Sequence, residues 1–584
     1  MSLLKQVWLF LTANQRRYGL IIIFLMFIAM ILESLSVGII LPLTSILFRG
    51  DLGNSFFANF FVIDLFSERN LIYIALTITI IIFLIKNLAL VFNLWEQTKF
   101  LRKLQFEITN KFFIYYLKKD YIFFLQNNSA HLYRNLTDIV SSAISYIKGY
   151  MIFFTEIVVF IGIIIVLFYV DFMGTVIILS LVSIVSLIIY VLTIGKISSF
   201  GEERNIAGGE LNKHLLQAMA AAKDVKILDR EEDLVYQVNK NLFKMTRLHQ
   251  IIQFINGLPR FSFEMLMICA FSLLVFMMMA AQREMTDIIQ YLSVFAVASF
   301  RIVPGASRIL SSFQSIKYME PSVKILLQEF DSKYHFVDKK NNQIQDSNTP
   351  LEFNKEINLS NLSFSYPSRK EFSLSKISMK INKGEFVGII GRTGSGKSTL
   401  INLLIGLLKP SEGKVEVDKL DINSNLHNWF NKIGYVPQSV YLTDDTIKKN
   451  IAFGLKEENI NDDLVKKAVE KTSLDKFLTN LQNGLNTIVG EKGIRLSGGQ
   501  QQRIGIARAL YRDPEILIFD EATSSLDIST EEKIMDSIQF LKRKKTLIII
   551  THRLSTVKNC DKIFFIDKGK IIKQGTPKEI LNNI

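Results

Sequence analysis

The segment "EFVGIIGRTGSGKSTLINLLIG", Glu385–Gly406, joins a short apolar run to a glycine-rich turn and the beginning of a helix. Its residues Gly391 to Ser398 fit the pattern G-x-x-x-x-G-K-S, in the strand–turn–helix context that a phosphate-binding loop requires. Glycines let backbone N–H groups surround phosphates, the lysine reaches the terminal phosphates, and the serine hydroxyl coordinates Mg²⁺. The residues predicted to bind the phosphates are Gly391, Arg392, Thr393, Gly394, Ser395, Gly396, Lys397, Ser398 and Thr399.

A second segment, "EILIFDEATSSLD", Glu515–Asp527, supplies the acids that such a loop needs. An apolar strand ends there in Asp520 and Glu521. Asp520 is placed to hold Mg²⁺ directly or through water, and Glu521 to polarise an attacking water as general base. Two acids also end ordinary strands, but their pairing with a phosphate-binding loop favours catalysis.

A third segment, "LSGGQQQRIGIARAL", Leu496–Leu510, predicts a helix whose N-terminus binds anions. Its first residues, Leu496–Gln500, resemble the signature of ATP-binding cassette transporters, and Ser497, Gly498, Gly499 and Gln500 are expected to bind the nucleotide. The resemblance implies that two cassettes clamp two ATP molecules, each between the Lys397 loop of one subunit and the Ser497 helix of the other.

The other motifs of that family follow the same order in this chain. By resemblance, Tyr366 in "SFSYP" stacks on adenine, and His552 in "IIITHRLS" holds the γ-phosphate. Gln438 in "IGYVPQ" matches the glutamine that links the nucleotide and metal site to the membrane domain, and Asp527 in "SSLD" matches a loop that contacts the opposite subunit. The resemblance thus implies Glu521, His552 and Gln438 as catalytic residues, and Ser398, Gln438 and Asp520 around Mg²⁺.

The rest of the chain has the composition of a membrane protein. Of 584 residues, 49% are hydrophobic and 45 are Phe, and the mean hydropathy is +0.27. Six segments are apolar over the ~20 residues that a spanning helix needs. They are Tyr18–Phe48, Leu71–Trp95, Met151–Val170, Met173–Ile194, Ile255–Ala281 and Ile288–Ser312.

The charges between these segments predict the orientation. Lysines and arginines concentrate before the first span and after the second, so both termini are expected in the cytoplasm. The net charge of +14 fits such loops better than nucleic-acid binding, because no basic stripe interleaved with aromatics is present. The two cysteines imply no disulfide framework, and the first span has no cleavage pattern, so it is expected to remain as an anchor.

These patterns predict three regions. Residues 1–326 are expected to form an α-helical transmembrane domain of exporter type with long cytoplasmic extensions, 327–350 a linker, and 351–584 an α/β cassette with a phosphate-binding loop. One cassette and one six-helix set per chain call for a dimer, most simply a homodimer. A membrane domain fused ahead of a cassette resembles exporters and flippases, and an inner-membrane location is expected.

Four cations lie inside the predicted spans: Lys86, Arg260, Arg301 and Arg308. Counting ~1.5 Å per residue places them ~20–30 Å below the outer side. A charge at that depth is costly, so a wet cavity that accepts an anionic group is one interpretation. Arg260 and Arg308 also suit snorkelling to headgroups, Glu264 can pair with Arg260, and Glu33 can neutralise a deeper cation.

An outer segment, "GNSFFANFFVIDLF", Gly53–Phe66, repeats aromatics at helical spacing. It predicts a helix lying in the membrane interface, or one packed on neighbouring spans.

Within the exporter family, "ASFRIVPGASRIL", "LPRFSFE" and "FLIKNL", with this aromatic segment, resemble the bacterial lipid-linked oligosaccharide flippases of protein N-glycosylation. The resemblance implies that Lys86, Arg260, Arg301 and Arg308 receive a polyprenyl-pyrophosphate-linked sugar, with Lys86 replacing an arginine. Membrane lipids and this anionic lipid are the expected partners, and no nucleic acid. Export of a peptide, drug or lipid A-like lipid stays open, as does an ATP-gated channel or regulator.

Overall fold

A computed structural model describes residues 3–40, 43, 68–283, 285–331, 351–367, 371–522 and 541–582. The chain divides into two compact units. One comprises Met1–Lys119 and Phe124–His335, and the other Asp120–Phe123 and Phe336–Ile584. The aromatic outer segment, Asp527 and most of the expected linker lie outside the described residues.

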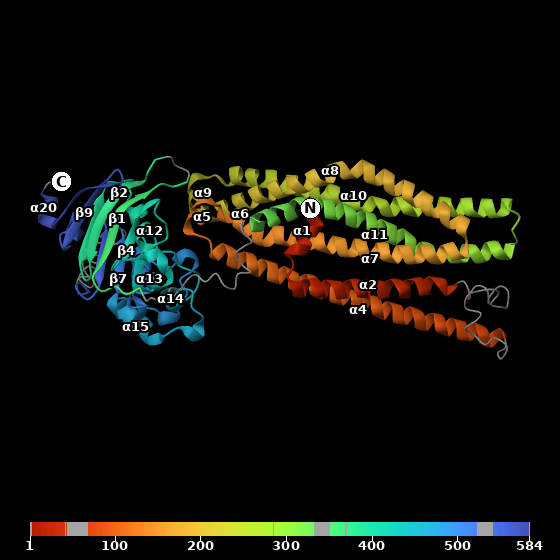
Figure 1. Cartoon of the computed structure of the whole chain (residues 1–584), viewed down its shortest axis with the longest axis horizontal. Coiled ribbons are helices and arrows are strands. Elements are labelled where there is room, and N and C mark those ends of the chain that lie inside the picture. The colour runs from red at the N-terminus through yellow and green to blue at the C-terminus, as the bar shows by residue number, and fades with distance from the viewer. Residues whose placement is uncertain are drawn as a thin grey trace. The chain divides into compact units, whose positions relative to one another are not determined.

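The N-terminal unit is a bundle of long helices (Figure 1). Six of its described helices are long and apolar enough to cross a membrane, which confirms the predicted number of spans. They are α2 (Ala13–Gly38), α4 (Glu68–Leu117), α7 (Val140–Val170), α8 (Phe172–Ala220), α10 (Glu231–Ala280) and α11 (Met285–Asp331). Its shorter elements are α1 (Leu3–Phe10), α6 (Ser129–Arg134), the π-helix η3 (Asn135–Ile139) and α9 (Ala222–Leu228). Helix α5 (Tyr121–Gln126) is divided, since its residues up to Phe123 belong to the other unit.

Most spans continue as helices well beyond their apolar parts. The 49 residues of α8 reach roughly 70 Å at ~1.5 Å each, about twice the ~30 Å hydrocarbon core of a bilayer. Capping side chains set the ends: Thr12 forms a capping box with Gln15 at the start of α2, and Asp171 accepts from the Gly174 N–H at the start of α8. Helix α11 runs to Asp331, past residue 326, where the membrane domain was expected to end.

The helices pack in two sets that share α7. Helices α7, α8, α10 and α11 enclose an apolar core, whereas α2 packs against both α4 and α7 (Figure 1). The most apolar stretch of α4 has none of its residues buried. The most extensive contact between helices of this unit is the one between α7 and α11.

The C-terminal unit contains two sheets. A four-stranded antiparallel sheet has the order β2-β1-β4-β5, and a six-stranded sheet has the order β10-β9-β3-β8-β7-β6. In the second sheet β9, β3, β8, β7 and β6 are parallel, and β10 pairs antiparallel with β9. The strands are β1 (Glu356–Phe364), β2 (Leu374–Asn382), β3 (Phe386–Gly391), β4 (Glu412–Val417), β5 (Leu420–Asp421), β6 (Ile433–Val436), β7 (Ile516–Asp520), β8 (Thr546–Ile550), β9 (Lys562–Asp567) and β10 (Lys570–Gly575).

Helices cover both faces of the six-stranded sheet, which explains why its central strands are runs of Val, Ile and Phe. The described α-helices are α12 (Lys397–Ile405), α13 (Leu426–Lys432), α14 (Ile447–Ile451), α15 (Asp462–Lys471), α16 (Asp475–Thr479), α17 (Gly498–Leu510), α19 (Leu554–Val557) and α20 (Pro577–Leu581). Short 3-10 turns occupy η5 (Ile422–Ser424), η6 (Glu457–Asn459), η7 (Gly484–Asn486) and η8 (Glu491–Gly493).

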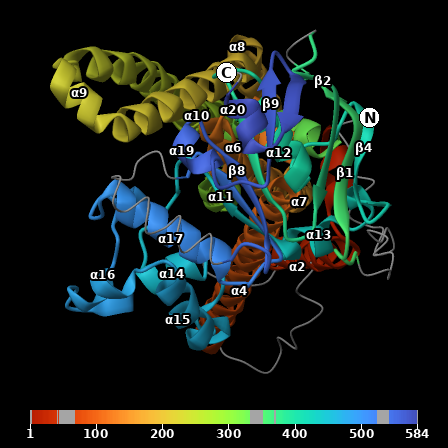
Figure 2. The ribbon, with the colours of Figure 1, turned by 90° about the vertical axis from the view of Figure 1, so that its left-hand side faces the viewer.

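Strand β3 shows how the two cores are divided. Phe386 and Ile390 point into a core shared with α14, α15 and α17, whereas Val387 and Ile389 point into one shared with α12 and β1. Figure 2 shows α14, α15, α16 and α17 grouped together, away from β1 and β2. The observed units confirm the predicted fold class, a six-helix membrane domain followed by an α/β cassette with a phosphate-binding loop.

Candidate functional site

The predicted catalytic residues meet at one edge of the six-stranded sheet. The phosphate-binding loop follows β3, His552 follows β8, Asp520 and Glu521 end β7, and Gln438 follows β6. These four strands are parallel neighbours, so their carboxyl ends lie side by side. Ligands of open α/β sheets bind at this edge.

The loop itself has a backbone that only glycine adopts without strain. Gly394 and Gly396 have φ of +80° and +103°, and a Cβ on Gly396 would lie 2.7 Å from Leu374 Cδ2. Lys397 Nζ donates to the carbonyls of Gly391 and Arg392, at 2.8 and 2.9 Å. The lysine is thus folded across its own loop, at the N-terminus of α12, where an anion is favoured.

Two features of the loop fit a phosphate group. The buried Ser395 hydroxyl has no hydrogen-bond partner among the described residues, although such a group normally has one. Ser398, in the first turn of α12, is exposed at the same end of the helix. With ATP in this loop, Mg²⁺ would be held by Ser398, Gln438 and Asp520 and would neutralise charge that develops on the phosphates.

Asp520 is a largely buried acid at the end of β7. Burial raises its pKa above the ordinary range, and the nearby Glu521 adds to this. The Tyr435 hydroxyl donates to Asp520 Oδ2 over 3.2 Å, which opposes the rise. Lys397 of the phosphate-binding loop also opposes the rise, and a carboxylate beside this loop suits a divalent cation.

Tyr435 is a site residue that sequence reasoning missed. It lies on β6 directly beside Ile518 of β7, and Ile518 stands two residues before Asp520. The signal was present in the chain, because Tyr435 stands three residues before Gln438 at the end of an apolar strand.

Glu521 has a backbone conformation that is unusual for its side chain. Its φ is +48°, and its N–H donates to the Ile550 carbonyl of β8 at 2.9 Å. Gln438 Nε2 donates to Glu521 Oε2 over 2.9 Å, and His552 Nδ1 lies 3.7 Å from Glu521 Oε1. The strained backbone and these two neighbours hold the carboxylate at the strand end.

The signature helix α17 begins as predicted. Ser497 caps it in a capping box with Gln500, and both side chains are used in this box. Gln502, one turn further, donates to the Gln438 carbonyl at 3.0 Å. Among the described residues, no hydrogen bond or ion pair joins Ser497 to the phosphate-binding loop of its own chain.

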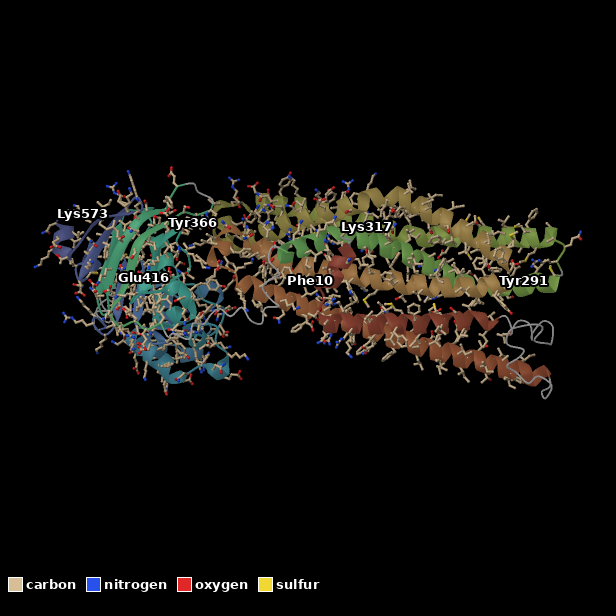
Figure 3. The ribbon with its side chains drawn as sticks, in the orientation of Figure 1. Phe10, Tyr291, Lys317, Tyr366, Glu416 and Lys573 are labelled. Atoms are coloured by element: carbon tan, nitrogen blue, oxygen red, sulfur yellow. The ribbon has the colours of Figure 1, made fainter. Side chains whose placement is uncertain are left out.

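Tyr366, labelled on the C-terminal unit in Figure 3, lies next to the first turn of α12. Its hydroxyl is 3.3 Å from Thr399 Oγ1, and its ring meets Phe364 edge-on with centroids 4.9 Å apart. The ring therefore stands beside the start of α12.

The cations of the N-terminal unit have different surroundings. Arg308 of α11 donates to Glu156 of α7 from Nε and Nη2, at 2.7 and 3.2 Å. Arg301 Nε lies 3.1 Å from Glu33 Oε2 of α2, which confirms Glu33 as a partner for a deep cation. Sequence reasoning missed Glu156, a lone acid inside a predicted span.

The other two cations of the predicted set are not part of these pairs. Arg260 pairs with Glu264 on its own helix, with Nε–Oε1 at 2.9 Å and both side chains largely exposed. Lys86 Nζ lies over the Phe83 ring, 4.4 Å from its centroid, and no ion pair to it is found in the described part of the chain. Arg301 and Arg308 thus share α11 but pair with acids of different helices, whereas Lys86 lies on α4 and Arg260 on α10.

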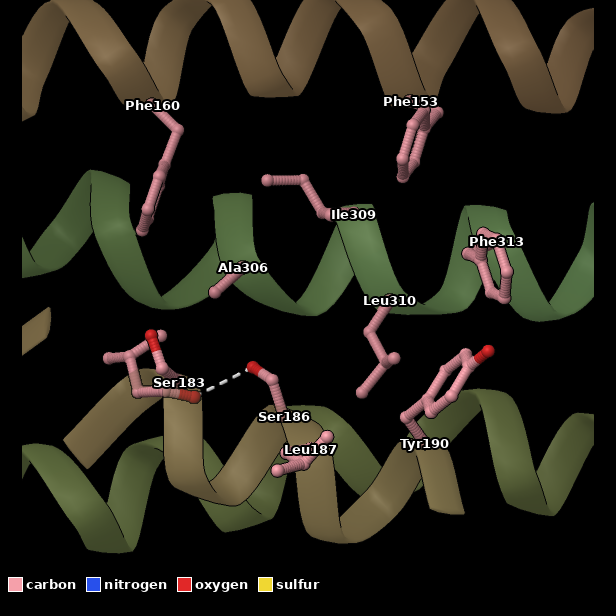
Figure 4. A pocket seen from close by; sticks show the side chains of 11 residues that line it. Phe153, Phe160, Ser183, Ser186, Leu187, Tyr190, Ala306, Ile309, Leu310 and Phe313 are labelled. Atoms are coloured by element: carbon pink, nitrogen blue, oxygen red, sulfur yellow. Dashed lines mark hydrogen bonds between the residues drawn. The ribbon is translucent and has the colours of Figure 1, made fainter. Parts of the chain in front are cut away.

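An apolar cavity of about 420 Å³ lies between α7, α8 and α11 (Figure 4). Phe153 and Phe160 of α7 line one side, and Tyr190 of α8 faces them beside Phe313 of α11. Ser186 also lines it but donates its hydroxyl to the Val182 carbonyl, at 2.7 Å. The size falls in the ~300–1,000 Å³ range of ligand pockets, and the lining suits an apolar group.

Comparisons with known proteins agree with both units. The family described as ABC transporter matches residues 374–524, and the ABC transporter transmembrane region matches residues 20–302. Together these matches cover most of the chain. Coupling ATP hydrolysis to transport is the general activity of this family.

Among curated proteins, an ATP-dependent lipid A-core flippase of Wigglesworthia glossinidia brevipalpis is 43% identical over 227 residues, 39% of each chain. The leukotoxin translocation ATP-binding protein LktB of Mannheimia glucosida is 44% identical over 233 residues, 40% of this chain and 33% of that protein. The matches thus span only about two fifths or less of these relatives.

The fold extends the likeness to the whole chain. The structure of a bacterial Atm1-family ABC exporter with ATP bound aligns with a TM-score of 0.77, covering 98% of this chain and 97% of the other at 21% identity. Given a six-helix unit, a cassette with its motifs in place and both family matches, the chain belongs to the ABC transporter family, with the architecture of an exporter half-transporter.

Proposed function

We propose that the chain is an ATP-driven exporter that works as a dimer of two copies in a cell inner membrane, with its cassettes in the cytoplasm. The observation that carries this proposal is the convergence of Lys397, Asp520, Glu521, Gln438 and His552 at neighbouring strand ends, in a chain with six spanning helices.

A second copy completes the nucleotide site. Each chain has one phosphate-binding loop and one Ser497 helix, and no hydrogen bond or ion pair joins Ser497 to the loop among the described residues. Facing copies supply each loop with the exposed N-terminus of the partner's helix, which favours negative charge. The exposed apolar stretch of α4 also calls for a covering surface, which lipid and a second copy provide.

In this arrangement the residues of the chain have separate tasks. Lys397 and the N–H groups of the loop hold the phosphates, and Tyr366 stacks on the base. Glu521, held by Gln438, accepts a proton from the attacking water, while His552 orients the terminal phosphate beside it. Closure of the two cassettes on ATP then drives the rearrangement of the helices.

The cargo that we propose is an anionic lipid, specifically a polyprenyl-pyrophosphate-linked oligosaccharide moved from the inner to the outer leaflet. Cations inside the spans support it, because guanidinium groups bind phosphate oxygens with directed hydrogen bonds. The apolar cavity beside α11 supports an amphipathic cargo with a hydrocarbon part.

A lipid A-like cargo is the second candidate. It is favoured by the two-fifths match to lipid A-core flippases, whose named cargo is also a lipid. Peptide export has support only from the leukotoxin relative. The cationic side chains inside the spans favour a phosphate-bearing lipid over a peptide.

The test is transport in proteoliposomes that contain a fluorescent polyprenyl-pyrophosphate-linked sugar, lipid A, or an apolar drug. We expect ATP-dependent flipping of the first, loss of flipping in Glu521→Gln, and loss in Arg301→Ala with Arg308→Ala while folding persists. Flipping of lipid A alone selects the second candidate, and flipping that survives Glu521→Gln excludes an ATP-driven pump.

A further inference from the structure

The pair of Arg308 and Glu156 is unequal in exposure. Glu156 has 9% of its side chain exposed, whereas Arg308 has 41%. The carboxylate is almost closed off from solvent, and the arginine side chain is partly exposed. A ligand that approaches this pair therefore meets the cation and not the acid.

The geometry leaves donors available for such a ligand. Arg308 uses Nε and Nη2 to hold both oxygens of Glu156. A guanidinium has five N–H donors in a planar fork, so about three are not taken by this carboxylate. Their directions are set, because a side-on, two-point contact orients the guanidinium plane.

Glu156 is buried on α7 and lies beside Gly305 of α11, in apolar surroundings. A Cβ added to Gly305 of α11 would lie 3.4 Å from Glu156 Oε2, and Phe160 lies beside the same glycine. Val159 and Ile163, the neighbours of Glu156 on α7, are buried. Burying a carboxylate here costs free energy that an apolar side chain would not, so helix packing alone does not account for it.

The same arrangement occurs a second time on α11. Arg301 is 25% exposed, and its partner Glu33 on α2 is 3% exposed. The 3.1 Å contact at Arg301 Nε is not aligned as a hydrogen bond, so this pair is held less firmly. Two partly exposed arginines on one helix are thus each backed by a buried acid from a different neighbouring helix.

We propose that Glu156 and Glu33 are positioning residues that hold Arg308 and Arg301 with their remaining donors toward a phosphate or pyrophosphate group of the cargo. The proposal rests on the proposed function and names its anion-recognition site. Orientation before binding avoids ordering a long, flexible side chain at the moment of binding.

Cargo-stimulated ATP hydrolysis measures this role in the full-length dimer. With a short-chain polyprenyl pyrophosphate as probe, Glu156→Gln should raise the half-saturating concentration about tenfold, because a charge-assisted contact is lost, with little change in the maximal rate. Glu320→Gln, which removes an acid paired with Lys317 and Lys324 further along α11, is the matched control and should leave that concentration unchanged.

A charge exchange separates positioning from mere packing. Glu156→Arg combined with Arg308→Glu keeps an ion pair but turns the exposed partner into an acid. We expect thermal stability to recover relative to either single change, and the response to the probe to stay lost. Full recovery of the response, or an unchanged half-saturating concentration in Glu156→Gln, overturns the proposal.

A chemical measurement tests the site without transport. Phenylglyoxal should modify Arg308 in the detergent-solubilised protein, and inorganic pyrophosphate should slow this modification in the wild type more than in Glu156→Gln, as read by mass spectrometry. Equal protection in both, or none in the wild type, contradicts the proposal. If pyrophosphate protects Arg308 in the wild type but the protein flips no polyprenyl-pyrophosphate-linked sugar, the proposed cargo is wrong and the anion site is supported.

Discussion

Gln438 and Glu521, 83 residues apart in sequence, are joined by a hydrogen bond of 2.9 Å from Nε2 to Oε2. The bond links the end of β6 to the end of β7, across the edge where nucleotide is expected. Glu521 also has φ of +48°, so its position depends on neighbours that hold it there. ATP hydrolysis should therefore depend strongly on the Glu521 carboxylate and less strongly on Gln438, which holds it in place.

Glu521→Gln should lower the ATP turnover number by ~10²–10⁴-fold, the usual contribution of a general base. The amide keeps the size of the side chain but accepts no proton at neutral pH. Binding of ATP, followed with a fluorescent analogue, should persist because the phosphate-binding loop is unchanged. A variant that hydrolyses ATP at the wild-type rate would rule out Glu521 as the base.

Gln438→Ala should have a smaller effect, roughly tenfold on the turnover number, because one hydrogen bond to a charged group is lost and the base itself remains. Gln501→Ala is a suitable control, since Gln501 donates to the Gly493 carbonyl within α17 and its preceding loop. Comparison of steady-state hydrolysis by the two variants checks this. Equal losses in both would indicate a general effect on folding.

The cassette was predictable because its motifs constrain the backbone directly. A glycine-rich turn after a buried strand can adopt few backbone conformations. Acids at the end of a parallel strand lie at the same edge of the sheet as this turn. Tyr435 stands near Gln438 in the sequence, but its contact with Asp520 also requires β6 to lie beside β7, and this strand order was not predicted.

The membrane charges were less predictable for a different reason. Glu33 and Arg301 are far apart in the chain, and their pairing requires α2 and α11 to meet. Glu156 was available as a lone acid in an apolar span, but its partner depends on the packing of α7 against α11. Hydropathy located all six spans but did not locate the ends of the helices, because the helices continue into polar residues.

Arg508→Ala should destabilise the cassette by ~3 kcal/mol, the scale of losing several bonds to a charged donor. Arg508 donates to the carbonyls of Tyr441 and Asn450, both at 2.8 Å, and burial lowers its pKa to about 10. Hydrogen–deuterium exchange of β3 and β7 peptides in the full-length protein measures the change. Arg512→Ala, at an exposed contact with Asn431, should stay within ~0.5 kcal/mol of wild type.

Cys560 should resist alkylation in the native protein. Burial raises the pKa of its thiol to about 12, so the reactive thiolate is scarce near about pH 8. In a Cys269→Ser background, iodoacetamide should label Cys560 only after unfolding, as measured by mass spectrometry. The rate should stay negligible as pH rises toward about 9, where an ordinary thiol ionises. Steadily increasing native labelling over that range would contradict the buried position beside Gly388.

Gly201 of α8 lies where α8 meets α11, and it tests how closely these helices approach. A Cβ at Gly201 would lie 2.1 Å from the Tyr318 carbonyl oxygen. This oxygen belongs to the backbone, so it cannot move aside by a change of side-chain rotamer. Gly201→Ala should therefore destabilise the bundle by ~1–3 kcal/mol, as overpacking does. Gly195, on the same helix, has no other atom within 4 Å of its added Cβ, so Gly195→Ala should be neutral or stabilise by up to ~1 kcal/mol. Thermal unfolding of both variants in detergent compares them directly, and equal midpoints would mean that α8 and α11 are further apart than the structure places them.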